Sequence, residues 1–394
     1  MSAAAEAFDH WIRGAFIEMN TALEEVYFAL DDPGDVIGAG EDIKGPLVEE
    51  GRALIAPLVA EGNTEQRFDI AFDVLGNLGL FLGALRRHEL TNPDNETRSP
   101  FEDCSALGMH IAASLGVAPR FATAHLTTHN RAVGGAPKSF TALADEKLFI
   151  DHNTFAILSY KKAGDALMRI PPMGVSSAAT PVLLDDAKQA LESVARFNKQ
   201  LFDDLDVRRF FYCVRPYYKP YRVGDYVYRG ANAGDFAEIN QIDLLLGLCR
   251  GNDPYYAQVL EEKILFMMPD DQQGVRNCLK MRPLLDEFLD AAEEFSTAPW
   301  FKENARAFID VCVAHGRTAQ QHHNMLFSKF IRTPAETLDA RHLEQITASG
   351  PALDALSEAL ERLRDLRIAA PRSDIETAHE ALSRLKRLAD WRDQ

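Results

Sequence analysis

Hydrophobic residues recur every three or four positions along most of this chain, which is the period of an amphipathic α-helix. Residues 64–89, for example, place Phe72, Leu75, Phe81 and Leu85 on such a pattern. The same rhythm predicts further helices at 3–30, 45–61, 101–115, 145–169, 184–205, 237–249, 254–267, 280–295, 302–331, 351–367 and 373–391. The pattern therefore predicts an all-α fold.

Two stretches interrupt this helical pattern. Residues 120–133 are rich in threonine and are expected to be extended, with Gly134 and Gly135 closing them. Residues 212–236 are rich in Tyr, Pro and Gly and are expected to be irregular. We expect an N-terminal helical portion over 1–135 and a larger helical portion over 136–394, with a ligand between them or within the second.

Composition limits the classes of partner. The 42 basic and 59 acidic residues give a formal charge of −17, which argues against nucleic acid or an anionic membrane as a partner. No apolar run is expected to reach the ~18 to 20 residues of a membrane span. The five cysteines are widely spaced and odd in number, which excludes the usual zinc and disulfide patterns and favours a reducing cytoplasm. The N-terminus carries early acids and no basic segment, unlike a secretion signal.

A histidine near the end of the helix predicted at 302–331 is the first candidate for chemistry. His323 shares one helical stripe with small and large apolar residues, namely Gly316, Ala319, Leu326, Phe327 and Phe330. The two small residues beside an imidazole suggest room for a flat molecule, and a porphyrin ligated by that imidazole would suit. The alternative is an ordinary core histidine. His322, about 100° away on the helix, is a competitor for the same role.

Arg215 is the candidate for binding an anion. It follows the apolar run that begins at Phe210 and precedes Pro216, so a guanidinium there is costly to bury unless it meets an acid. One interpretation is an arginine that binds a substrate carboxylate with two parallel hydrogen bonds. The other is an arginine that pairs with a protein acid or lies exposed at a helix end. The nearby Tyr217 is suited to stacking on an aromatic ligand.

Two further motifs are weaker. The segment Gly230–Gly234 allows close backbone approach to a ligand and leads into a helix whose first amides can bind a phosphate, a carboxylate or a haem propionate. His125 and His129 are four residues apart, but in an extended segment they stand too far apart to share one metal ion.

Taken in order, these segments resemble the indoleamine 2,3-dioxygenase superfamily. The motifs that carry the resemblance are Phe210-x4-Arg215, the glycine-rich loop before Asp243-Leu-Leu-Leu-Gly, Met268-Pro269 with Arg276-Asn277, and His323-x5-Lys329-Phe330-Ile331-x2-Pro334. Three other stretches are closest to the monodechloroaminopyrrolnitrin synthase (PrnB-like) family, and they start at Leu80, Ser139 and Arg215. The resemblance implies an indoleamine-dioxygenase-like helical bundle, haem b as cofactor, dioxygen as co-substrate and a tryptophan-like substrate.

The resemblance also implies roles for single residues. His323 matches the proximal haem ligand, Arg215 the arginine that binds the substrate carboxylate, and Phe210 a side chain of the pocket. The segment that closes over haem and substrate matches Gly230, Ala231, Asn232, Ala233 and Gly234, and Ala319 is expected to line the haem. The chain departs from the superfamily at His152, where an aromatic residue is usual, and at Ala156, where a small hydroxyl residue is usual. A distal histidine there favours a catalytic acid or base and makes hydroxylation or rearrangement more plausible than plain ring dioxygenation.

The leading hypothesis is therefore a cytoplasmic haem oxygenase that acts on an aromatic, tryptophan-like amino acid in bacterial specialised metabolism. An external reductant is one option that the sequence leaves open. The alternatives are a haem oxygenase or rearrangement enzyme for a non-aromatic amino acid, a haem-binding sensor without turnover, and a helical scaffold without cofactor.

Overall fold

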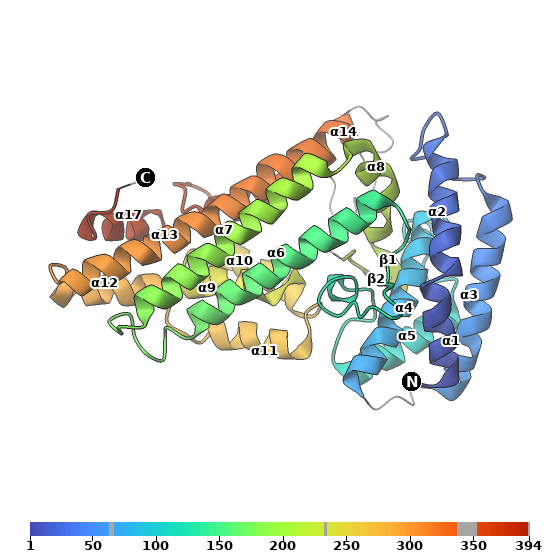
Figure 1. Cartoon of the computed structure of the whole chain (residues 1–394), viewed down its shortest axis with the longest axis horizontal. Coiled ribbons are helices and arrows are strands. Elements are labelled where there is room, and N and C mark those ends of the chain that lie inside the picture. Colours follow the sequence, from blue (N-terminus) through green and yellow to red (C-terminus); the bar gives the residue numbers. More distant parts are fainter. Residues whose placement is uncertain (63–66, 232–234, 337–352, 393–394) are drawn as a thin grey trace. The chain divides into compact units, whose positions relative to one another are not determined.

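The computed structural model describes residues 1–62, 67–231, 235–336 and 353–392 (Figure 1). Helix accounts for 68% of the residues that the structure describes and strand for 2%, which confirms the predicted all-α class. The chain forms two compact units, and each of them is built from several separate segments. The first comprises 1–151, 204–233 and 329–356, and the second comprises 152–203, 234–328 and 357–394. The boundary that the sequence suggests at residue 135 lies inside the first unit.

The first unit is a set of helices around one apolar helix. Its elements are α1 (Ala3–Ile12), α2 (Ala15–Phe28), α3 (Glu41–Glu61), α4 (Phe68–Arg87), α5 (Glu102–Leu115), the start of α6 (Ala144–Met168), α8 (Val207–Arg209) and α14 (Thr333–Glu336). The helix predicted at 3–30 is thus two helices, because the backbone breaks at Gly14. A pattern of apolar spacing does not reveal such a break, since both helices keep the same buried face.

Helix α4 is buried along almost its whole length. A Cβ atom on Gly79 would lie 2.6 Å from the backbone nitrogen of Phe121, so the glycine permits that segment to approach the helix. By length and composition α4 passes as a membrane span, and the expectation that no apolar run reaches this length is wrong. However, 78% of that window is buried inside the protein, as in a core helix.

The segment predicted to be extended at 120–133 is instead a 3-10 helix, η1 (Thr123–His125), followed by turns. Side chains hold these turns: the Thr127 hydroxyl donates to the Thr123 carbonyl, and the Asn130 side chain bonds both the amide and the carbonyl of Lys138. Such local hydrogen bonds compete with strand pairing, which explains why the threonine content was misleading.

The irregular region predicted at 212–236 contains short elements of three kinds. A π-helix, η2 (Phe210–Val214), continues into a 3-10 helix, η3 (Arg215–Tyr218), and then into the antiparallel hairpin of β1 (Tyr221–Val223) and β2 (Tyr226–Tyr228). Tyr221 pairs with Tyr228, and Gly224 turns the chain with φ +59°.

The second unit has a separate core. Its elements are the rest of α6, α7 (Thr180–Asp204), α9 (Ala237–Leu246), α10 (Pro254–Ile264), α11 (Pro269–Cys278), α12 (Leu284–Phe295), α13 (Pro299–Gln321), most of the π-helix η5 (His322–Arg332), most of α16 (Leu353–Arg367) and α17 (His379–Leu388). Within this unit the long helices α6, α7 and α13 lie side by side (Figure 1), tied by hydrogen bonds from Tyr160 to Thr318 and from Gln321 to the Ala195 carbonyl.

Two differences from the predicted helices matter for the site. Helix α11 is absent from the sequence-based prediction, although Pro269 at its first turn and two following aspartates are an ordinary start signal. The single helix predicted at 302–331 is an α-helix only as far as Gln321 and continues as a π-helix.

Candidate functional site

The predicted site residues fall in both units. Phe210, Arg215, Tyr217, Gly230 and Ala231 belong to the first unit, whereas His152, Ala319 and His323 belong to the second. Asn232, Ala233 and Gly234 lie outside the described residues.

The π-helix that precedes Arg215 is anchored from α4. Arg87 forms two 2.8 Å hydrogen bonds with the Glu24 carboxylate and donates a third, at 2.9 Å, to the Tyr212 carbonyl. Glu24 and Arg87 are both buried, so this pair is shielded from water and salt. The anchored carbonyl holds η2 in place, and Arg215 follows directly at the start of η3. π-Helical turns are rare and concentrate at functional sites.

Arg215 itself meets no carboxylate in the part of the chain that the structure describes. Its guanidinium carbon lies 5.5 Å from the centre of the Phe211 ring, and its Nη2 atom is buried without a hydrogen-bond partner. Burial lowers the pKa of Arg215 to about 10, with no acidic neighbour acting against it. By contrast, Arg209 in the same segment binds Glu25 at 2.9 and 3.1 Å. The interpretation of Arg215 as the partner of a protein acid is therefore not what the described residues show.

The aromatic neighbours of Arg215 differ in their roles. Phe210 is buried between Phe149, at 5.1 Å between ring centres, and Phe330, at 5.9 Å. Tyr217 is only 1% exposed and its ring already stacks on Phe140 at 4.5 Å. Phe140 occupies one face of the Tyr217 ring, and stacking of Tyr217 on a substrate stays a prediction.

The glycine-rich loop is only partly described. Gly230 and Ala231 are buried, and the chain resumes at Asp235 before helix α9. The first turn of α9 carries Glu238, which is itself buried and binds Lys161 at 3.2 Å. A phosphate or propionate at these amides would face that carboxylate, so the helix start is poorly suited to the anion that the sequence suggested.

His323 is the second residue of the π-helix η5, two residues beyond the end of α13. Its side chain is half-buried, and its ring stacks on the buried Phe327 with 5.8 Å between ring centres and 22° between planes. His322 is exposed. An imidazole beside a buried aromatic ring is a donor suited to a haem iron, with apolar surroundings that suit the porphyrin.

Of the two small residues on the His323 stripe, Gly316 and Ala319, Gly316 leaves no space for a ligand. Ala319 is 7% exposed on α13. A Cβ atom on Gly316 would lie 3.0 Å from Ile368 Cγ2 and 3.2 Å from the Arg367 carbonyl oxygen. The interpretation of Gly316 as room for a flat ligand is wrong, because the chain that follows α16 fills that space.

His152 lies on α6, one turn before the buried Ala156. Its side chain is half-buried, with its ring centre 6.2 Å from that of Phe155. Within the second unit, its position on a long helix is compatible with an acid–base role, which therefore stays a prediction.

A buried network around Asp243 was missing from the sequence-based site. Its carboxylate binds Arg367 at 2.7 and 2.9 Å, accepts from His315 Nε2 at 2.7 Å and accepts from the Tyr256 hydroxyl at 2.8 Å. Burial would raise the pKa of Asp243, but Arg367 and His315 outweigh it and hold that pKa well below its usual value. The sequence did contain a signal for this network: Asp243 is the one acid inside the apolar run Ile242–Leu246, and a buried acid needs a partner.

These contacts fasten the helix that leads to His323. Asp243 lies on α9, and its partners lie on α10, α13 and α16. Asp310, on the same helix α13, accepts a hydrogen bond from the Trp391 indole at 2.9 Å and lies 3.5 Å from Lys188.

The other candidate sites have less structural support for a functional role. His125 is a core histidine: its Nδ1 accepts from the Ala122 amide, so its Nε2 donates to the Phe72 carbonyl at 2.9 Å. Among the described residues, no group of three His, Cys, Asp or Glu side chains is placed to hold a metal ion.

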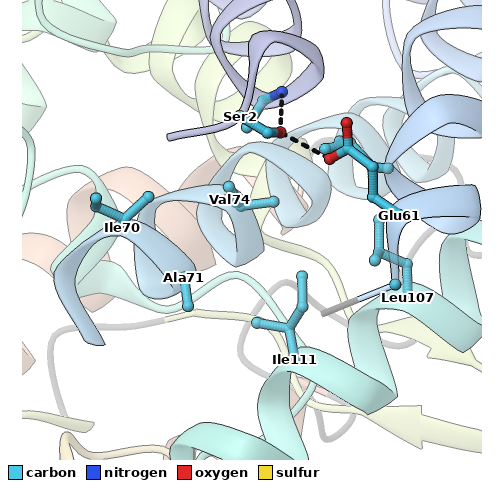
Figure 2. A pocket seen from close by; sticks show the side chains of 10 residues that line it. Ser2, Glu61, Ile70, Ala71, Val74, Leu107 and Ile111 are labelled. Atoms are coloured by element: carbon cyan, nitrogen blue, oxygen red, sulfur yellow. Dashed lines mark hydrogen bonds between the residues drawn. The ribbon is translucent and has the colours of Figure 1, made fainter. Parts of the chain in front are cut away.

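A pocket in the first unit is lined mainly by apolar side chains. Ser2 and Glu61 also line it and are joined by a 2.7 Å hydrogen bond (Figure 2). No predicted site residue lines it.

An all-α protein with a desolvated, uncompensated arginine directly after a π-helix is suited to bind the anionic group of a small molecule. The comparison with known families narrows this class. The family model of monodechloroaminopyrrolnitrin synthase PrnB matches residues 2–389, and the chain belongs to that family. This family consists of haem-dependent enzymes. Membership supports an enzyme with oxygenase chemistry and a role in tryptophan-related biosynthesis.

Proposed function

We propose that the protein is a haem-b-dependent oxygenase, with dioxygen as co-substrate, that acts on a tryptophan-like amino acid. The observation that carries the proposal is Arg215, a buried guanidinium without a carboxylate among the described residues. An unmatched buried charge of this kind is costly and is stabilised when an external carboxylate binds it. The family supports the reaction class.

The chain offers residues for each task. His323 would hold the haem iron through its imidazole, and Ala319 would line the porphyrin. Haem, when bound, supplies the redox-active iron needed for oxygen chemistry. Arg215 binds and orients the substrate carboxylate, and Phe210 packs against the aromatic part of the substrate. His152 would hold or release a proton as an acid or base.

The first test concerns haem. Purified wild-type protein, expressed with ample haem, should show a Soret band that His323→Ala loses and that His322→Ala, the matched neighbouring variant, keeps. A Soret band lost in His322→Ala and kept in His323→Ala would reassign the ligand. A wild-type protein without haem would overturn the proposal.

The second test concerns Arg215. Tryptophan and its carboxamide should be compared by spectral titration of the haem-loaded protein. Arg215→Ala should weaken tryptophan binding by roughly tenfold to a hundredfold, since a hydrogen bond to a charged group contributes about 1.5–3 kcal/mol. Binding of the carboxamide should change little. Arg209→Ala is the control, because that guanidinium already has a protein carboxylate.

Substrate class is tested by the same titration with other amino acids. An aliphatic amino acid that binds as tightly as tryptophan would replace the aromatic class. A proton-transfer role for His152 predicts that His152→Gln alters the pH profile of turnover without altering tryptophan affinity.

A further inference from the structure

The first unit carries more buried positive charge around Arg215 than its own acids neutralise. Four cations come together there, Arg86 and Arg87 from α4, Arg215 from η3 and Lys219 just after it. Two are matched within the protein: Arg87 by Glu24, and Arg86 by Glu89 with a 2.6 Å hydrogen bond.

Lys219 is the second unmatched cation. It is half-buried, and among the described residues no carboxylate or carbonyl accepts a hydrogen bond from its Nζ. Glu89 is near, but its carboxylate is engaged by Arg86 and by the Asn92 side chain at 2.9 Å. Lys219 therefore has no hydrogen-bonded carboxylate of its own, and Glu89 compensates its charge only in part.

The local backbone explains why Lys219 and Arg215 act on the same region. They stand at the two ends of one 3-10 turn, and that turn packs on α4. The contact is close at Gly83, where a Cβ atom would lie 3.3 Å from the Tyr217 carbonyl oxygen. The next turn of α4 carries Arg86, so the approach of the two segments assembles the cluster.

We propose that Lys219 and Arg215 form a two-cation subsite for a carboxylate group, in which Lys219 is a specificity-determining residue. This rests on the proposed function. The carboxylate comes from the amino-acid substrate or from a haem propionate, and the chemistry of recognition is the same in both cases. One bound carboxylate neutralises part of the excess charge, and the ammonium and guanidinium donate hydrogen bonds to its oxygens.

The electrostatic state of Lys219 gives the subsite a measurable property. Burial and then Arg86 lower the pKa of Lys219 to about 8; Glu89 opposes them, and Arg87 and Arg215 add smaller lowering effects. A carboxylate bound beside Lys219 favours the charged amine and raises that pKa. Binding near pH 8 is therefore accompanied by proton uptake, and affinity falls as the pH rises above about 8.

The experiment is calorimetric titration of haem-loaded protein with tryptophan at pH 8, in two buffers of different ionisation enthalpy. Wild-type protein should take up about half a proton per ligand, since about half of the Lys219 amines are neutral at a pH equal to their pKa. Lys219→Met should bind tryptophan roughly tenfold or more weakly and take up none. Lys219→Arg should keep the affinity and lose the proton uptake, a result that a merely structural role would not give. Lys147→Met, at an exposed position of the same unit, should behave as wild type.

A second arm identifies the source of the carboxylate. If Lys219→Met weakens haem b binding but not binding of haem dimethyl ester, and leaves tryptophan unchanged, the subsite holds a propionate. If all three affinities and the proton uptake equal those of wild type, the subsite is refuted while the proposed function stands. Wild-type protein that binds haem but no amino acid defeats the proposed function instead.

Discussion

Asp243→Asn should destabilise the second unit severely. The wild-type carboxylate is fully buried and binds Arg367, His315 and Tyr256. Asparagine keeps the shape and one acceptor oxygen but removes the charge. The variant therefore leaves the Arg367 guanidinium inside the protein without a counter-charge.

The magnitude follows from burial. Removing one partner of a buried ion pair costs about 3–5 kcal/mol. The Arg367 side chain is 15% exposed and reaches some water, which places the expected loss near the lower end, at about 3 kcal/mol. Against a domain stability of about 5–15 kcal/mol, this loss is large.

Urea unfolding followed by tryptophan fluorescence measures this loss. Trp300 and Trp391 belong to the second unit and Trp11 to the first, so a Trp11→Phe background makes the signal report the second unit. Asp203→Asn, which breaks an exposed pair with Lys199 in the same unit, is the control and should cost roughly 0.5 kcal/mol or less.

The pH dependence of the free energy of unfolding also tests the contribution of Asp243. Because the folded-state pKa of Asp243 is depressed, its contribution is present above its unfolded pKa near 3.8 and is lost as the pH falls below that value. The difference between wild type and Asp243→Asn should be constant from pH 5 to 8 and shrink on acidification. A loss under about 1 kcal/mol at pH 7, equal to that of Asp203→Asn, would refute the reasoning.

Three further predictions concern the first unit. Gly79→Ala should cost about 1–3 kcal/mol, because the added methyl group meets the Phe121 backbone; thermal unfolding measures it, and an unchanged midpoint would contradict the close approach. His125 has its pKa lowered to about 3 by burial, so wild-type stability should fall as the pH drops below about 6.5, by up to about 1.4 kcal/mol per pH unit from this group, and His125→Gln should lack that slope. In urea unfolding, Glu24→Leu and Arg87→Met should each cost about 3–5 kcal/mol, and the double variant should cost less than either. A double variant as unstable as the sum would show that the pair is not coupled.

Much of the fold could be predicted from apolar spacing. The helix predicted at 101–115 is α5, Glu102–Leu115, and the one predicted at 145–169 is α6, Ala144–Met168. Both have a continuous buried face, which a single period describes. Failures occurred where a local backbone event overrides that period: the break at Gly14 and the change from α to π geometry after Gln321.

The candidate site was predictable in part for similar reasons. Motif order was enough for the resemblance to the monodechloroaminopyrrolnitrin synthase family, which the family match confirms. Residue type and neighbours pointed to Arg215. Gly316 was misjudged, because a small residue has the same sequence signature whether a ligand or the protein fills the adjacent space.

The sequence by itself determined the all-α class, most helix positions and the family, because these depend on the local order and period of side chains. Only the tertiary structure decided which charges are compensated. Asp243 and Arg367 are 124 residues apart and pair in the second unit, and Glu24 and Arg87 pair in the first, whereas Arg215 and Lys219 form no ion pair within the described chain. Whether a buried charge stabilises the fold or awaits a ligand depends on what distant segments bring to it, and spacing along the chain carries no record of that.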